Sequence, residues 1–181
     1  MRPSARGGTE ARVTLKAAPE VGTVTRTARF EGFYRSERPG LYRALALTLG
    51  DPDLAAEAVD EAMARAYQRW RRVCGYDNPA GWVYRVGLNW AISRSRKRGR
   101  VVTVAAVHDE RGCTDPAPPD DDLTAAVAAL PDKQRQVVVL RYHLDWSIDK
   151  IGAALALPAG TVKSRLHRGL AALRENLESM P

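Results

Sequence analysis

Residues 101–122 constrain the fold of this chain more than any other segment. Six acidic side chains stand there among three prolines, and a single arginine opposes them. A stretch of this composition cannot bury a core, so it predicts an exposed, flexible linker. At 181 residues the chain is long enough for one ordinary domain or two small ones, and the position of the linker favours two.

Apolar residues recur at helical spacing on both sides of this linker, and no strand alternation of useful length is present. The pattern begins at Phe30 and continues after Pro39-Gly40. Two signals of a capping residue followed by proline, Asp51-Pro52 and Asn78-Pro79, predict the starts of further helices, the second continuing to about Lys97. We therefore expect an all-α fold class, with two small helical bundles joined by the flexible acidic linker.

These patterns divide the chain into four parts. Residues 1–27 lack periodic apolar positions and are interpreted as a disordered N-terminal extension; a start codon placed too far upstream would give the same pattern. We expect an N-terminal helical domain over residues 28–100, the acidic, proline-rich linker over 101–122, and a C-terminal domain over 123–178.

The charge of the chain indicates a polyanionic partner. The formal net charge is +7, and nucleic acid is the leading candidate, ahead of an anionic membrane surface. Arginine supplies most of the positive charge, and its planar guanidinium suits phosphate and guanine edges. No apolar run approaches the ~20 residues of a membrane span, and the first 27 residues lack the apolar core of a secretory signal. We therefore expect a cytoplasmic protein with no direct membrane insertion.

The residue types that commonly carry catalysis or bind metals are dispersed. His108, His143 and His167 form neither a metal-ligand cluster nor a Ser-His-Asp grouping. Cys74 and Cys113 are too few for a disulfide framework or a four-thiolate zinc site, so we interpret them as separate reduced thiols. A nucleic-acid enzyme is therefore disfavoured, and we expect no catalytic residue, metal, cofactor or small-molecule substrate.

The last part of the chain has the spacing of a helix-turn-helix. Ser147 can cap a short helix over Ile148–Leu155, which a tight turn at Ala156-Leu157-Pro158 follows. A second helix is expected from about Ala159 to Leu177. Two helices joined by three or four residues predict a helix-turn-helix, whose second helix can enter the major groove of DNA.

The side chains of this second helix segregate by chemistry. An apolar stripe is expected to face the core, formed by Val162, Leu166, Leu170, Leu173 and Leu177. The outer face carries Thr161, Ser164, Arg165 and Arg168, flanked by Lys163 and His167. The alternative is an ordinary amphipathic helix, but a solvated face usually mixes both signs of charge, and no acid precedes Glu175 in this helix.

One segment of the C-terminal part reads LPDKQRQVVVLRYHLDWSIDKIGAALALPAGTVKSRLHRGLAALRENL. It resembles the C-terminal domain of bacterial RNA polymerase sigma factors of the extracytoplasmic-function (ECF) class, within the sigma-70 family. The string GTVKSRLHRGLAALR is its most specific part. In that family this helix reads the upstream (−35) promoter element. The resemblance therefore implies five DNA contacts, namely Thr161, Lys163, Ser164, Arg165 and Arg168.

The turn of the helix-turn-helix departs from the family pattern. The family commonly has Gly-Ile-Ser where this chain has Ala156-Leu157-Pro158. Alanine in place of a glycine that relaxes a left-handed turn costs about 1 kcal/mol. Proline replaces a capping serine, although proline is itself well placed at a helix start.

The stretch from Phe30 to Arg100 resembles the N-terminal domain of the same family. The motif NPAGWVYRVGLNWAISRSRKR closely matches the family helix that contacts the downstream (−10) element. In the family, the preceding loop holds a base flipped out of the non-template strand. Here that loop is Cys74–Asn78, in which Tyr76 is a candidate stacking platform.

The expected −10 helix carries a polar face suited to base edges. Arg85, Asn89 and Arg96 lie within about 40° of one another at 100° per residue, and arginine and asparagine read bases bidentately. The basic run over 94–100 would bind phosphates, or would be a solvated helix end favoured by the helix dipole. The predicted −10 contacts are Tyr76, Asn78, Arg85, Asn89, Arg94 and Arg96.

The aromatic residues of this helix have two interpretations. Trp82, Tyr84 and Trp90 could stack on unpaired bases, or they could pack in the core. At helical spacing the core is the more common environment, and it is favoured here for Trp82 and Trp90.

An acidic face on the preceding helix is expected to bind core RNA polymerase. It is formed by Glu57, Asp60 and Glu61, and the resemblance implies a coiled coil of the largest polymerase subunit as its target. The family often has an acid at position 58 and glutamine at position 60, where this chain has Ala58 and Asp60.

The resemblance implies a sigma factor that binds core RNA polymerase, recognises the −35 and −10 elements of promoter DNA and assists DNA melting. An anti-sigma factor is an expected further partner. The alternative function is a self-sufficient helix-turn-helix transcriptional regulator. The N-terminal half favours the sigma factor, because it has an acidic helix and a basic helix where a ligand sensor would need a pocket.

The acidic segment over 108–122 suggests one further hypothesis. It could act as a polyanion mimic in the nucleic-acid channel of the polymerase, or it could be a spacer between two basic bundles.

Overall fold

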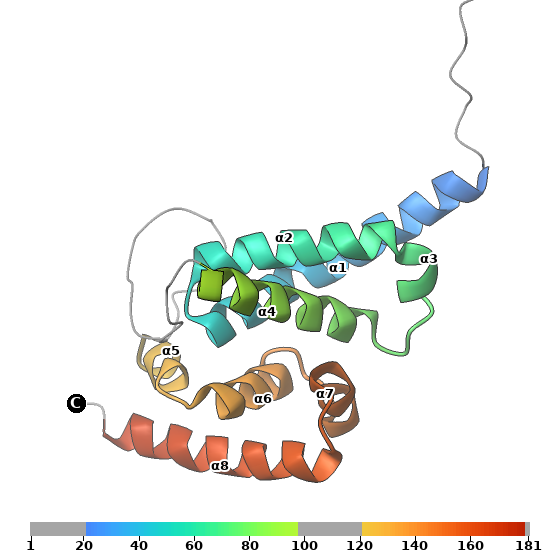
Figure 1. The fold of residues 1–181 in the computed structure, drawn as a ribbon. Coiled ribbons are helices and arrows are strands. Elements are labelled where there is room, and N and C mark those ends of the chain that lie inside the picture. Colours follow the sequence, from blue (N-terminus) through green and yellow to red (C-terminus); the bar gives the residue numbers. More distant parts are fainter. Residues whose placement is uncertain (1–20, 98–120, 180–181) are drawn as a thin grey trace, which may run out of the picture.

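The computed structural model describes residues 21–97 and 121–179, and these are helical with no strand (Figure 1). The all-α fold class is therefore confirmed. The helices are α1 (Val21–Leu49), α2 (Pro52–Gln68), α3 (Trp70–Val73), α4 (Pro79–Lys97), α5 (Asp121–Ala128), α6 (Asp132–Tyr142), α7 (Ile148–Leu155) and α8 (Ala159–Glu178).

Local capping signals define the N-terminal bundle of α1, α2 and α4. The Asp51 carboxylate accepts a hydrogen bond from the Leu54 amide at 2.8 Å, and the Asn78 side chain accepts one from the Gly81 amide at 2.8 Å. Both predicted helix starts are therefore confirmed. Gly50 reverses the chain between α1 and α2 at φ 66°, where a side chain would be strained.

Two boundaries differ from those expected. α1 begins at Val21 and runs through Pro39, so residues 21–27 are helical rather than part of a disordered extension. Once a helix is nucleated, adding residues to its end costs little. These residues can therefore be helical without the periodic apolar positions that would signal a helix in the sequence. α5 begins at Asp121, inside the expected linker. The hypothesis for the acidic segment concerns residues that lie mostly outside the described ones.

The predicted helix-turn-helix is confirmed as α7, a short turn and α8. The Ser147 hydroxyl accepts a hydrogen bond from the Lys150 amide at 3.2 Å, which caps α7 as expected. Ala156 adopts the left-handed conformation, with φ 54° and ψ 50°. The Leu157 amide then donates to the Gly152 carbonyl at 2.9 Å, so the chain folds back tightly against the end of α7.

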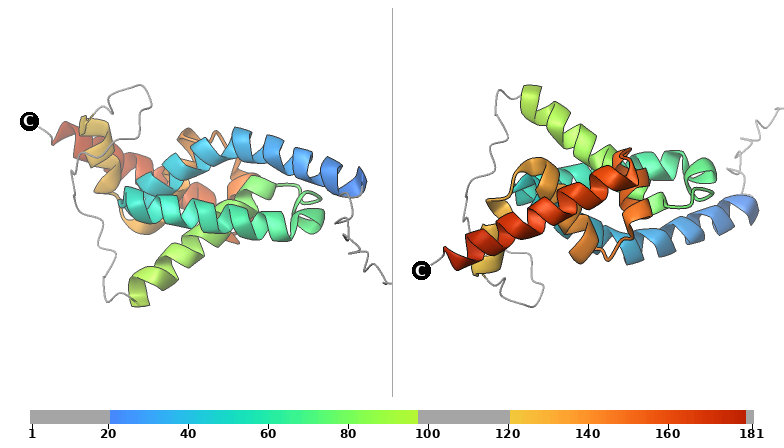
Figure 2. Two further views of the ribbon diagram at one scale, coloured as in Figure 1. Left: turned by 90° about the horizontal axis from the view of Figure 1, so that it is seen from above. Right: turned by 90° about the horizontal axis from the view of Figure 1, so that it is seen from below.

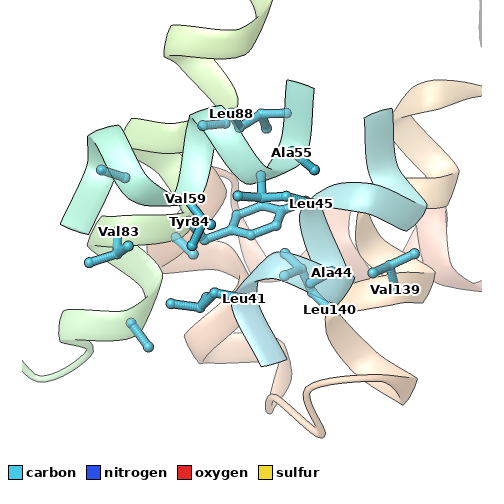
Figure 3. Packing of buried hydrophobic residues seen from close by; sticks show 14 of the residues in the cluster. Leu41, Ala44, Leu45, Ala55, Val59, Val83, Tyr84, Leu88, Val139 and Leu140 are labelled. Carbon is cyan, nitrogen blue, oxygen red and sulfur yellow. The ribbon is translucent and has the colours of Figure 1, made fainter. Parts of the chain in front are cut away.

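The two bundles pack directly on each other and share one apolar cluster, which the sequence did not indicate. Figure 3 shows Tyr84 of α4 among Leu41 and Leu45 of α1, while Val139 and Leu140 of α6 approach from the other bundle. The Tyr84 ring also meets the Trp146 ring edge-on, with centroids 6.2 Å apart. Burial leaves Trp146 only 7% exposed.

A buried arginine joins the bundles at the end of α1. Arg135 is 3% exposed, and its guanidinium donates to the Thr48 carbonyl at 3.2 Å and to the Leu130 carbonyl at 2.5 Å. Thr48 stands in the last turn of α1, where carbonyls have no partner within the helix and attract positive charge. Burial lowers the pKa of Arg135 from its usual value, and nearby Asp132 opposes this shift.

Beside Arg135, the hydroxyls of Thr48 and Tyr84 share a buried hydrogen bond of 2.9 Å. Burial raises the pKa of Tyr84 well above its usual value, and the hydrogen bond to Thr48 partly opposes this. The phenol therefore stays neutral, and its only polar atom is satisfied inside the shared cluster.

Two substitutions in the helix-turn-helix are expected to change stability in opposite directions. Ala156→Gly removes the strain of a left-handed alanine and should raise the free energy of unfolding by about 1 kcal/mol. Gly152→Ala should lower it, because the added Cβ would lie 2.8 Å from the Leu157 carbonyl oxygen. Urea unfolding followed by circular dichroism measures both. A destabilised Ala156→Gly variant would contradict the strain argument.

Candidate nucleic-acid interface

The outer face of α8 carries the five residues expected to contact DNA. Lys163, Ser164 and Arg168 are exposed, whereas Thr161 and Arg165 are half-buried. The helix runs along one side of the molecule (Figure 1) and crosses the face seen in the right-hand view of Figure 2. The Arg168 guanidinium lies back along its own helix, donating to the Ser164 carbonyl at 3.2 Å. This face is therefore accessible with the bundles packed together.

The apolar stripe expected on α8 is wrong at two positions. Leu170 and Leu177 are 37% and 40% exposed, whereas Val162 and Gly169 are buried. A Cβ at Gly169 would lie 2.8 Å from a Val138 methyl group, so the missing side chain lets α8 approach α6 closely there. The buried stripe is centred on this glycine, and the leucines fall at its edge.

The structure brings three of the predicted −10 residues together on α4. Arg85, Asn89 and Arg96 are all exposed on the side of the helix that faces away from the cluster. The C-terminal part of α4 projects from the N-terminal bundle, which leaves this side open to solvent (Figure 2). The three side chains form what we call the α4 polar face.

Arg94 lies apart from the α4 polar face. It forms an ion pair with Glu57 of α2 at 2.8 Å, and its guanidinium stands 5.2 Å from the centroid of the Trp90 ring. The ion pair directs Arg94 toward α2, and the Trp90 ring of its own helix lies beside it. The structure therefore separates it from the three residues with which it was grouped.

The loop before α4 has a structural role at Asn78. The side-chain oxygen of this residue caps α4, and Tyr76 is half-buried and packs against the core. Cys74 is exposed, and its thiol lies 3.7 Å from the Arg71 carbonyl oxygen. The amide nitrogen of Asn78 is buried and has no hydrogen-bond partner within the described part of the chain, so a base could reach it only after a local rearrangement of the loop.

The expected polymerase-binding face carries arginines as well as acidic side chains. All three carboxylates pair with arginines at 2.8 Å, namely Glu57 with Arg94, Asp60 with Arg38 and Glu61 with Arg65. These side chains are roughly a third to a half exposed, so each pair contributes about 0–1 kcal/mol and is readily exchanged for another partner. The face is therefore electrically compensated in the isolated chain.

The structure decides between the two interpretations of the aromatic residues. Tyr84 is fully buried, so it cannot stack on a base with the bundles packed together. Trp82 and Trp90 are half-buried and pack against the core cluster, in agreement with the favoured interpretation.

Sequence reasoning missed four arginines. Arg69, Arg71 and Arg72 are exposed around α3, beside the loop that precedes α4. Their close spacing in the sequence was the signal that could have identified them as a basic surface. Arg135 carried no signal, because its burial depends on α1 and α6 meeting. Among the described residues, no group of three or more His, Cys, Asp or Glu could hold a metal ion, and no helix has the length and apolar character to cross a membrane.

Comparison with known proteins gives matches over both bundles. The model of Sigma-70 region 2 matches residues 33–101, and the model of Sigma-70, region 4 matches residues 120–173. The chain is 36% identical to the RNA polymerase sigma-E factor of Streptomyces avermitilis, over 83% of this chain and 86% of that protein. It is 32% identical to the ECF RNA polymerase sigma factor SigL of Mycobacterium tuberculosis, over 94% and 97% of the two chains.

A solved structure of a sigma factor has a similar fold. It is the sigma factor RpoE in complex with the anti-sigma factor NepR from Bartonella quintana, with a TM-score of 0.68 and 24% identity. The match covers 84% of this chain and 99% of that chain. Both bundles are therefore included in the similarity.

Substitutions at Asn78 should test its role as the cap of α4. Asn78→Ala should lower the free energy of unfolding by about 1 kcal/mol, because the Gly81 amide loses its acceptor. Asn78→Asp keeps the acceptor and adds a favourable charge at the helix start, so stability should be retained. Urea unfolding of both variants tests this. Equal stability of the alanine variant and the unchanged chain would contradict the capping role.

Proposed function

The chain belongs to the sigma-70 family, in the ECF class, and we propose from this premise which of its surfaces perform the steps of promoter recognition. It is a sigma factor, which binds core RNA polymerase and directs transcription initiation at promoters. The observation that carries this conclusion is the match of both regions, in order, over the two bundles. A self-sufficient regulator is disfavoured because region 2, and not a sensor domain, precedes the helix-turn-helix.

The recognition of the −35 element is assigned to α8. Its outer face is basic, and α8 is the second helix of the helix-turn-helix, the helix that such motifs present to a major groove. The α4 polar face is assigned to the −10 element, because arginine and asparagine read base edges. The binding of core RNA polymerase is assigned to Glu57, Asp60 and Glu61, because their ion pairs are weak enough to be exchanged for contacts with a partner.

The remaining assignments follow from the same family. The chain itself catalyses nothing and acts as a recognition subunit at the polymerase in the cytoplasm. An anti-sigma factor is proposed as a regulatory partner, since a sigma factor with this fold has been solved with one.

The packed arrangement of the bundles cannot serve both promoter elements at once. Elements named −10 and −35 lie about 25 base pairs apart, which is ~85 Å along the duplex at 3.4 Å per base pair. α4 packs against α7, which directly precedes α8, and each reading helix is only about 30 Å long. We infer that the bundles separate when the chain binds a promoter.

Arg165 provides the test of −35 recognition. Arg165→Ala should cost about 1–3 kcal/mol of promoter binding and relax specificity at one base position if the side chain reads a base. The measurement is run-off transcription with core RNA polymerase over a set of −35 variants. Arg174→Ala is the matched control, since this exposed arginine of α8 pairs with Glu178 and lies outside the expected contacts. An equal loss of transcription on every promoter would indicate that Arg165 contacts a phosphate and not a base.

The separation of the bundles is tested by energy transfer between two dyes. Cysteines introduced by Asp53→Cys on α2 and Glu175→Cys on α8, with Cys74 and Cys113 replaced by serine, should show efficient transfer in the free chain. Transfer should fall in the complex with polymerase and promoter. A pair at Glu31→Cys and Asp53→Cys lies within one bundle and should not change. Undiminished transfer across the bundles in an active complex would exclude separation.

A further inference from the structure

Aromatic side chains gather where the N-terminal part of α1 meets α2 and α3. The centroid of the Phe30 ring lies 5.0 Å from that of Tyr67 and 5.3 Å from that of Trp70, which it meets edge-on. The Phe33 ring lies 4.9 Å from the Trp70 ring. Aromatic rings at these separations attract each other beyond the effect of buried area. We call Phe30, Phe33 and Trp70 the aromatic clamp.

The aromatic clamp holds a helix that is too short to be stable alone. α3 has four residues, and a single turn does not offset the cost of nucleation in water. Two of its side chains anchor it, Trp70 at 5% and Val73 at 1% exposed. The indole nitrogen of Trp70 is buried and has no hydrogen-bond partner over residues 21–97 or 121–179. Packing against the clamp therefore determines where α3 lies.

The loop between α3 and α4 takes its shape from α3. The amides of Cys74, Gly75 and Tyr76 donate hydrogen bonds to carbonyls of α3, over distances of 2.9, 3.2 and 3.1 Å. The other end of the loop is fixed separately, by the cap that Asn78 provides for α4. A shift of α3 would therefore move the first half of the loop while α4 stays in place.

Phe30 reaches α3 from outside the matched family region, which begins at residue 33. The N-terminal part of α1 extends past the end of α2 and runs beside α3 (Figures 1 and 2). Over residues 26–49, the buried side chains of α1 begin at Leu41, about three turns further along the helix. Phe30 therefore serves the α3 end of the bundle and not its centre.

We propose that Phe30 is a positioning residue for −10 recognition, which acts through Trp70 to hold α3 and the first half of the loop over 74–78 in register with the α4 polar face. The inference rests on the proposed function and deepens it, because it names a determinant that lies outside the reading surfaces. Phe30 itself contacts no DNA. The three exposed arginines around α3 are carried by the same helix, so their positions depend on the same clamp.

The test compares two DNA probes bound by the full chain in complex with core RNA polymerase. Both come from a promoter that the unchanged chain transcribes: a single strand that carries the −10 element, and a duplex that carries only the −35 element. Phe30→Ala should weaken binding of the −10 strand by about two- to tenfold, the equivalent of one aromatic pair, as measured by fluorescence anisotropy. Binding of the −35 duplex should not change. Equal weakening of both probes, or no weakening of the −10 strand, would overturn the proposal.

Two variants separate positioning from general stability. Leu54→Ala truncates a side chain that is 6% exposed, at the end of α2 opposite to α3. It should destabilise the same bundle in urea unfolding without discriminating between the probes. Phe30→Tyr keeps the ring and should retain binding of the −10 strand. A selective loss of the −10 strand in Leu54→Ala, or a loss in Phe30→Tyr as large as in Phe30→Ala, would make the effect one of stability and reject the positioning role.

The route through Trp70 is tested by a double-variant cycle. Trp70→Leu removes the ring through which Phe30 acts, so adding Phe30→Ala in that background should cause no further loss of the −10 strand. A further loss of full size would exclude this route. Run-off transcription with the unchanged chain tests the proposed function separately. A chain that transcribes no promoter refutes that function and this inference with it, whereas an active chain without the difference between the probes rejects this inference alone.

Discussion

The arrangement of this molecule depends on a buried arginine between its two halves. Arg135 donates to the Thr48 carbonyl at the end of α1 and to the Leu130 carbonyl before α6. A buried cation without such partners would be strongly destabilising, so these bonds determine where α6 sits on α1. That placement brings Trp146 against Tyr84 and joins two bundles into one apolar cluster.

This packing buries the apolar surfaces of the two bundles against each other and leaves their polar surfaces exposed to solvent. The outer face of α8 and the α4 polar face remain in solvent, while one ion pair within α2 and two from α2 to α1 and α4 compensate the charges of the acidic face. Exposed ion pairs are weak and exchange readily. The apolar cluster therefore holds the isolated chain together, and the charged surfaces are left available to partners.

Sequence reasoning succeeded where the physical signal was local. Asp51 and Asn78, each followed by proline, predicted two helix starts, and both residues cap those helices. The turn at Ala156 was expected to be strained and left-handed, and it is left-handed. It failed where the decision lay in another element. The leucine stripe of α8 is displaced because Gly169 lets the helix approach Val138, and a glycine in a helical pattern does not by itself indicate a close contact.

The sequence by itself determined the helical class, the order of the two family regions and the helix-turn-helix, because capping and periodic burial act within a few residues of the chain. Only the tertiary structure decided that Tyr84 is buried rather than available for stacking, that Arg94 faces Glu57 rather than the α4 polar face, and that the bundles share a core. Each of these depends on how closely two helices distant in sequence approach. That distance is determined by packing and charge burial across the whole molecule.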